Sequence, residues 1–97
     1  MTTEELRKRA KRCFNTAEQI LKKRGVSMKY RAILELDKAR IVIEEYCGDN
    51  WHFMCDFIFH ANGQMEYWSC GSSSWRYNFS MVKFKELMYN VGIYHVV

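Results

Sequence analysis

Residues 20–36 read ILKKRGVSMKYRAILEL, and within this stretch the spacing of the apolar residues changes from that of a helix to that of a strand. Up to Gly25, the apolar residues recur at steps of three and four, which places them on one side of an α-helix. From Val26 onward, apolar and polar residues alternate, which places them on opposite faces of a β-strand. The chain is therefore expected to begin with a helix and to continue as a sheet.

The helix is predicted over residues 2–25, because signals for both of its ends are present. Thr2 followed by Glu5 is typical of a capping box at a helix N-terminus, and Gly25 after three basic residues is typical of a C-terminus. The apolar residues of this segment form a stripe about 120° wide. This stripe must face a core, and it consists of Leu6, Ala10, Cys13, Phe14, Ala17, Ile20 and Leu21.

Antiparallel strands are predicted over residues 26–37, 40–47, 51–60 and 64–70, with a possible fifth over 75–79. Strict alternation over residues 51–60 places one set of side chains on a shared face: Trp51, Phe53, Cys55, Phe57 and Phe59. The outward face is expected to be more apolar than a freely solvated face, since it would carry His52, Met54, Ile58, Trp68, Ile33, Val42 and Tyr46. Either a second helix or a partner should cover it.

Two connections between strands have clear signals. Asn62 and Gly63 are predicted to form a two-residue type I′ turn with Phe59 and Met65 near its base, because both central residues of such a turn need positive φ. Residues 71–74, GSSS, are expected to form a loop.

A second, shorter helix is predicted after Ser80, which is a typical N-cap residue, and Gly92 is its stop signal. Residues 93–97 could add an edge strand. The predicted fold class is α+β. It has an antiparallel meander sheet of four to five strands, a long N-terminal amphipathic helix and a shorter C-terminal helix, in the order α-β-β-β-β-(β)-α-β.

Length and composition indicate a single domain over residues 1–97. Three Trp, six Tyr and six Phe supply large side chains for a core, so disorder is not expected. We expect a cytoplasmic protein, since the N-terminus is charged and amphipathic where a signal peptide would be apolar. Four Cys residues without a secretory signal are expected to be reduced, with Cys13 and Cys55 buried on apolar stripes.

Catalysis and metal binding are not expected from the residue patterns. Residues 47–70 contain three Cys and two His, but no CxxC pair and no HExxH motif. Cys70 beside Gly71 is the best candidate for a nucleophile, but no recognisable base or oxyanion hole accompanies it. The five glycines match no phosphate-binding loop. We therefore expect no cofactor, no small-molecule substrate and no membrane partner.

Charge is distributed unevenly along the chain. Residues 1–40 contain twelve Lys and Arg against five Asp and Glu, a net charge of +7, whereas residues 41–97 contain three against six, a net charge of −3. Five of the six residues from 7 to 12 are basic. On a helical wheel, the polar side opposite the apolar stripe carries Lys8, Lys11, Arg12, Asn15, Gln19, Lys22 and Lys23. Such asymmetry is typical of contact with nucleic acid or an acidic surface.

The function expected from these patterns is that of a small binding module without catalysis. Its partner-binding residues would be this polar side of the first helix together with Trp68, Trp75, Arg76 and Tyr77, whose types dominate interfaces and also stack on bases. In one version, the partner is an acidic protein surface of a nucleic-acid-handling complex, which the module inhibits or regulates. By analogy of size and charge, phages and mobile elements encode such inhibitors, anti-CRISPR proteins among them.

In a second version, the module binds RNA or DNA directly, since its helix–strands–helix order loosely resembles double-stranded-RNA-binding domains. We expect the protein partner more strongly, because the acidic second half of the chain would repel a phosphate backbone. A cysteine-dependent enzyme is a distant third interpretation.

Overall fold

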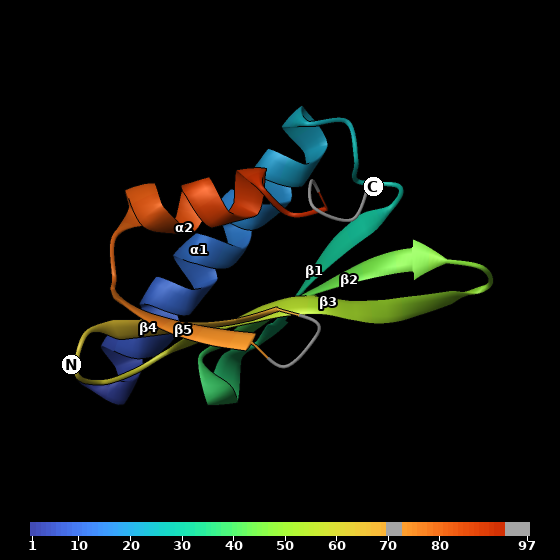
Figure 1. Cartoon of the computed structure of the whole chain (residues 1–97). Coiled ribbons are helices and arrows are strands. Elements are labelled where there is room, and N and C mark those ends of the chain that lie inside the picture. The colour runs from blue at the N-terminus through green and yellow to red at the C-terminus, as the bar shows by residue number, and fades with distance from the viewer. Residues whose placement is uncertain (70–72, 93–97) are drawn as a thin grey trace.

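The structure is a computed structural model, and it describes residues 1–69 and 73–92 (Figure 1). Its elements are α1 (Thr3–Lys23), β1 (Tyr30–Glu35), a 3-10 turn η1 (Leu36–Lys38), β2 (Arg40–Cys47), β3 (Asn50–Phe59), β4 (Gln64–Ser69), β5 (Ser73–Asn78) and α2 (Met81–Tyr89). The five strands form one antiparallel sheet in the order of the sequence. This confirms the predicted α+β meander, and the possible strand over 93–97 lies outside the described residues.

Local hydrogen bonds form both ends of α1, as predicted. The Thr2 hydroxyl accepts from the backbone N–H of Glu5 at 3.1 Å, and the Glu5 carboxylate accepts from the N–H of Thr2 at 3.0 Å. At the other end Gly25 has a φ of 72°, the left-handed conformation that closes helices. The bounds of α1 thus follow from residues within the segment.

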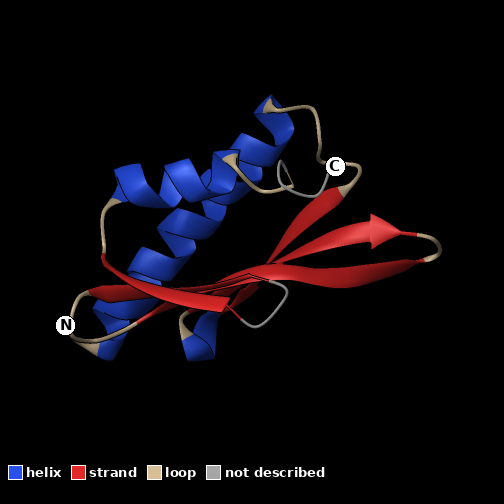
Figure 2. Cartoon of the chain, viewed as in Figure 1, coloured by secondary structure: helices blue, strands red, loops and turns tan. Residues whose placement is uncertain are grey.

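Both helices pack against the same face of the sheet (Figure 2). Fully buried small residues of α1, such as Ala10 and Cys13, share one core with inward-facing strand residues such as Phe57. Phe84 of α2 meets Phe57 edge-on, with 4.7 Å between the ring centroids. The sequence left open whether the second helix covers the outward face. It does not, because its buried side chains Phe84 and Met88 belong to the inner core.

The first strand begins at Tyr30, and the prediction that it starts at residue 26 is wrong. The backbone N–H groups of Lys29 and Tyr30 both donate to the carbonyl of Val26, at 3.0 and 2.9 Å, and fold this segment into a turn. Met28 is 89% exposed. The alternation of apolar residues continues through the turn, so it misplaced the start of the strand.

A β-bulge in β3 moves several side chains to the face of the sheet opposite the one predicted. Ile43 pairs with Cys55, but the next residue, Glu44, pairs with Phe53, so Met54 is an extra residue in the ladder. Met54 is consequently buried in the core, although it was predicted to face outward.

Residues before the bulge change sides as well. Trp51 and Phe53 pair with the outward-facing Tyr46 and Glu44 and therefore lie on the outer face, where we had predicted the inner one. His52 pairs with Glu45 and faces inward for the same reason. Because residues 51–55 are mostly apolar, their pattern does not reveal the inserted residue.

The hairpin between β3 and β4 exists with Phe59 opposite Met65, as predicted, but its turn differs. The N–H of Gly63 donates to the carbonyl of His60 at 3.0 Å, and among the residues of this turn only Gly63 has a positive φ, of 87°. Asn62 thus precedes the left-handed position, and the type I′ assignment is wrong. The side-chain oxygen of Asn62 accepts from the N–H of Gln64 at 3.0 Å. This contact supports a longer loop that needs a single positive φ.

Candidate partner-binding surfaces

The predicted polar side of α1 is solvent-exposed along its whole length. We call it the basic face of α1, and it consists of the predicted Lys8, Lys11, Arg12, Asn15, Gln19, Lys22 and Lys23, to which we add the exposed Arg7. It lies opposite the stripe that α1 buries against the sheet. Capping at both ends and burial of the stripe hold the backbone of this face in a helical conformation.

Two other arginines of this region serve the fold instead. The Arg9 guanidinium lies 4.2 Å from the ring centroid of Phe79. Arg24 donates to the carbonyls of Met88 and Val91 at 3.0 and 2.8 Å, and so binds the C-terminal end of α2. Arg9 and Arg24 therefore contact other parts of the fold, whereas the cations of the basic face remain exposed. Only the tertiary structure shows this difference.

The basic face has almost no compensating acid. Of its cations, Lys8 alone has an ion pair among the described residues, an exposed one with Glu4 at 3.6 Å. Elsewhere in the described chain, the cations from residue 29 onward are ion-paired with acids, Lys85 excepted: Lys29, Arg31, Lys38, Arg40, Arg76 and Lys83. The net positive charge of the protein is thus concentrated on α1.

The acids of the second half of the chain are correspondingly paired, Asp49 excepted, among the described residues. Glu44 and Glu45 bind cations of the β1 region, Asp56 binds Arg40, and Glu66 binds Arg76. They belong to the sheet and not to α1. The acidic second half of the chain was the reason to expect a protein partner over nucleic acid. Most of its negative charge is neutralised by ion pairs within the sheet.

The four predicted binding residues of the β4–β5 region do not form one site. Trp68 and Arg76 lie on the outer face, whereas the alternation of β5 puts Trp75 and Tyr77 on the side of the helices. There Trp75 stacks on Tyr67 with 5.9 Å between centroids.

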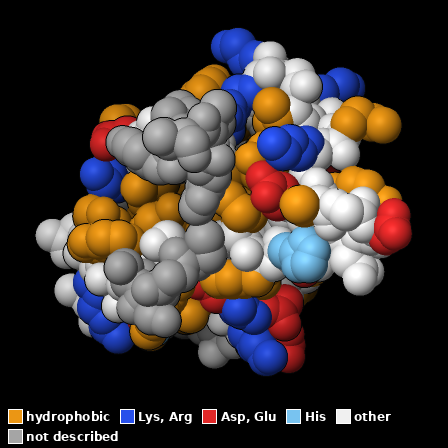
Figure 3. Space-filling model, turned by 45° about the vertical axis from the view of Figure 1, so that its right-hand side comes forward, with side chains coloured by type: hydrophobic (Ala, Val, Ile, Leu, Met, Phe, Trp, Pro, Cys, Tyr) orange, Lys and Arg blue, Asp and Glu red, His pale blue; other side chains and the backbone are white. Residues whose placement is uncertain are grey.

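A cavity of about 460 Å³ separates this part of the sheet from α2, with Met54, Cys55, Tyr67, Trp75, Tyr77 and Leu87 in its lining. Hydrophobic side chains also reach the surface at several places on the face shown in Figure 3, between separate groups of Lys and Arg. Exposed apolar area alone therefore does not identify a site.

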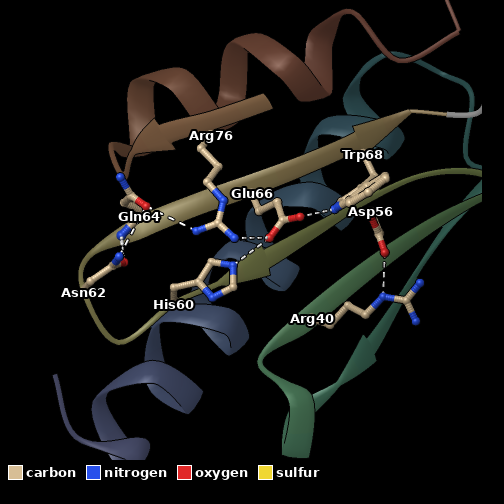
Figure 4. A network of polar contacts seen from close by, with 8 residues as sticks. All are labelled: Arg40, Asp56, His60, Asn62, Gln64, Glu66, Trp68 and Arg76. Atoms are coloured by element: carbon tan, nitrogen blue, oxygen red, sulfur yellow. Dashed lines mark hydrogen bonds and ion pairs between the residues drawn. The ribbon is translucent and has the colours of Figure 1, made fainter. Parts of the chain in front are cut away.

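A polar network occupies the outer face of the sheet (Figure 4). Glu66 accepts from the indole N–H of Trp68, lies 2.8 Å from the His60 ring nitrogen and accepts from Arg76 at 3.2 Å. The contact with His60, followed by that with Trp68, lowers the pKa of Glu66. The charge of Arg76, a predicted partner-binding residue, is thus compensated within the sheet.

Asp56 is the second carboxylate of this face. Its Oδ2 accepts from Arg40 at 2.6 Å, while its buried Oδ1 has no partner among the described residues. Burial raises its pKa despite the neighbouring guanidinium. Asp56 is therefore a buried acid with an unused acceptor on a face that no described helix covers.

Three further aromatic residues lie on the outer face, and the sequence pattern placed only Tyr46 of them there. Tyr46 and Trp51 lie where β2 and β3 extend as a hairpin beyond the other strands (Figure 1), and Phe53 lies opposite Glu44, next to that extension. No signal in the sequence placed Trp51 and Phe53 there, because the bulge that turns them outward is a property of strand pairing.

Cys13 and Cys55 are buried, as predicted, whereas Cys47 is exposed. Burial raises the pKa of the Cys13 thiol to about 12. Within residues 1–69 and 73–92, no three His, Cys, Asp or Glu side chains come together as a metal site would require. Cys70 lies outside the described residues.

Comparisons with protein-family models, curated proteins and solved structures gave no match. In the described part of the chain, neither helix has the length and apolar character needed to cross a membrane.

Proposed function

We propose that this protein is a non-enzymatic binding module that acts in the cytoplasm by docking the basic face of α1 onto an acidic macromolecular partner. One observation carries the proposal. Arg7, Lys11, Arg12, Lys22 and Lys23 share one exposed helix face without an ion pair among the described residues, while nearly all later cations are paired.

Concentrated like charge has a small energetic cost, which a partner would offset. Arg7 with Lys11, and Lys8 with Arg12, are spaced four residues apart and repel by about 0.2–0.5 kcal/mol per pair. A helix of 21 residues is about 30 Å long, so the face presents its charges along a rigid rod. Such a field steers an acidic partner and accelerates association.

The first candidate partner is an acidic protein surface of a nucleic-acid-handling complex, which the module would inhibit or regulate in the manner of phage-encoded inhibitors. A preformed helix on a well-packed core supports this candidate, because rigid surfaces lose little entropy on docking.

The second candidate partner is nucleic acid itself, and a specific observation favours it. The basic face contains amides and cations, with Glu18 beside them, but no apolar side chain, whereas the centres of protein interfaces are usually apolar and poor in Lys. Asn15 and Gln19 lie between the two groups of cations, in the arrangement that would let amides face bases while cations contact phosphates.

The test compares two variants of equal net charge. In the first, Lys11, Arg12 and Lys22 of the basic face are changed to Gln; in the control, Lys29, Lys38 and Lys85 are changed to Gln. We expect the first variant to remain folded and to lose binding, and the control to retain it. Affinity for nucleic acid is measured with labelled duplex DNA and RNA. Binding of protein partners is measured by co-purification from the native host at low and high salt.

The salt dependence of binding identifies the partner. For duplex DNA, each lost phosphate contact reduces the slope of log affinity against log salt by about 0.9. For a protein partner, the association rate and its salt dependence fall without that slope. If the folded basic-face variant binds every partner of the wild type with unchanged affinity, the proposed function is wrong.

A further inference from the structure

The outer face of the sheet carries an aromatic strip that the basic face of α1 does not explain. We call Tyr46, Trp51, Phe53 and Trp68 the outer aromatic strip. The pairs Tyr46 with Trp51 and Asp56 with Trp68 place these side chains on the face opposite the helices. Tyr46, Phe53 and Trp68 are 43%, 42% and 36% exposed. These are the residue types that dominate binding energy at protein interfaces.

Neighbouring side chains hold the strip in place. The Arg31 guanidinium lies 4.2 Å from the ring centroid of Trp51 and binds Glu44 at 2.7 Å. The rings of Trp51 and Tyr46 are 5.2 Å apart. A partner would therefore meet aromatic groups that are already ordered, so little conformational entropy is lost on contact.

Trp68 is held in the same way, since its indole N–H donates to Glu66. Trp68 is the strand partner of Asp56.

The charges of this face define the chemistry of its partner. Its three arginines, Arg31, Arg40 and Arg76, are each paired with acids of the same face: Glu35, Glu44, Asp56 and Glu66. No described cation there is left to attract phosphate. The unpaired charge that a partner can reach is acidic, because Asp49 at the hairpin tip has no ion pair among the described residues, whereas the unpaired Asp56 Oδ1 is buried. A surface complementary to this face is apolar at its centre and basic at its rim.

We infer that the outer aromatic strip docks a protein whose contact surface is apolar and bears Lys or Arg opposite the hairpin tip. This inference does not rest on the proposed function, because it uses other residues, which the strand register places on the face of the sheet opposite the helices. The two surfaces can be occupied together, so the protein can link this partner to the one bound by α1.

Site-specific photo-crosslinking in the native host tests the inference. p-Benzoylphenylalanine replaces Tyr46 or Phe53 in the strip and, as the control, Val82, which is 78% exposed on α2. We expect one protein to be crosslinked from both strip positions and not from residue 82. That protein is then identified, purified and used as the probe for affinity measurements.

The affinity measurements use matched variants of the full chain. Phe53→Ser and Trp68→Ala are each expected to weaken the Kd for this probe about 10-fold or more. Val82→Ser and the basic-face variant are expected to leave it within about 2-fold. If loss of the Trp68–Glu66 contact unfolds the Trp68→Ala variant, Phe53→Ser alone still decides the test.

Several results would overturn the inference. They are a crosslink that forms equally from residue 82, no crosslink from either strip position, and a Kd unchanged by Phe53→Ser in folded protein. A crosslink between two copies of this chain, with concentration-dependent dimers in sedimentation, would replace the distinct partner by self-association. If the folded basic-face variant keeps every partner of the wild type and the strip variants lose theirs, the proposed function alone is refuted.

Discussion

Gly92→Ala should be one of the most destabilising small substitutions in this protein. Gly92 has a φ of 82°, and an added Cβ would lie 2.8 Å from Cζ of Tyr30 and closer still to its hydroxyl oxygen. Tyr30 is 5% exposed, and its hydroxyl donates to Glu45 at 2.7 Å. The ring therefore cannot move aside without losing a hydrogen bond to a carboxylate.

The expected loss in the free energy of unfolding has two parts. A non-glycine residue in the left-handed region costs about 1–2 kcal/mol. Displacing Tyr30 adds about 1.5–3 kcal/mol for the lost charge-assisted bond. Gly63→Ala provides the control, since Gly63 has a φ of 87° but nothing within 4 Å of an added Cβ. The two variants should therefore differ by the cost of the contact with Tyr30.

Thermal and urea unfolding, followed by circular dichroism, measure this difference. For a domain of this size, 1 kcal/mol corresponds to about 4–8 °C, so the Tm of Gly92→Ala should lie at least about 6 °C below that of Gly63→Ala. In a Tyr30→Phe background, Gly92→Ala should cost less, because the closest atom and its hydrogen bond are already absent. Equal Tm values for the two glycine variants would refute the proposed contact between Gly92 and Tyr30.

Three further predictions concern other parts of the molecule. Arg24→Gln should lower the free energy of unfolding by about 1–2 kcal/mol, because the last carbonyls of α2 lose their donor, whereas the exposed Lys23→Gln should change it by less than about 0.5 kcal/mol; urea unfolding of both decides. The lowered pKa of Glu66 means that its contribution to stability is present above pH 4.5 and lost as the pH falls below it, so the difference between wild type and Glu66→Gln should shrink on acidification, and a constant difference would contradict the assigned contacts. In native protein, a thiol reagent should label the exposed Cys47 rapidly and Cys13 only on unfolding, as mass spectrometry after timed labelling would show; fast labelling of Cys13 would mean that the α1 stripe is not buried.

The elements of this fold were largely predictable because their signals are local. The Thr2–Glu5 capping box and Gly25 define α1 within a single segment, and Ser80 does the same for the start of α2. Short connections between successive strands make neighbours in sequence neighbours in the sheet, which is why the meander was predicted correctly. The errors occurred where a local pattern has more than one meaning. The alternation from residue 26 runs through a turn, and the turn before Gln64 needs only one left-handed residue.

What the sequence by itself determined is the amphipathic first helix, the order of the strands and the excess of positive charge in the first forty residues. Which cations remain uncompensated was decided by tertiary structure, because Arg9 and Arg24 are used by Phe79 and the end of α2. The same holds for the aromatic residues. The bulge at Met54 and the pairing of Asp56 with Trp68 depend on contacts between strands, and only these contacts place the outer aromatic strip on one face.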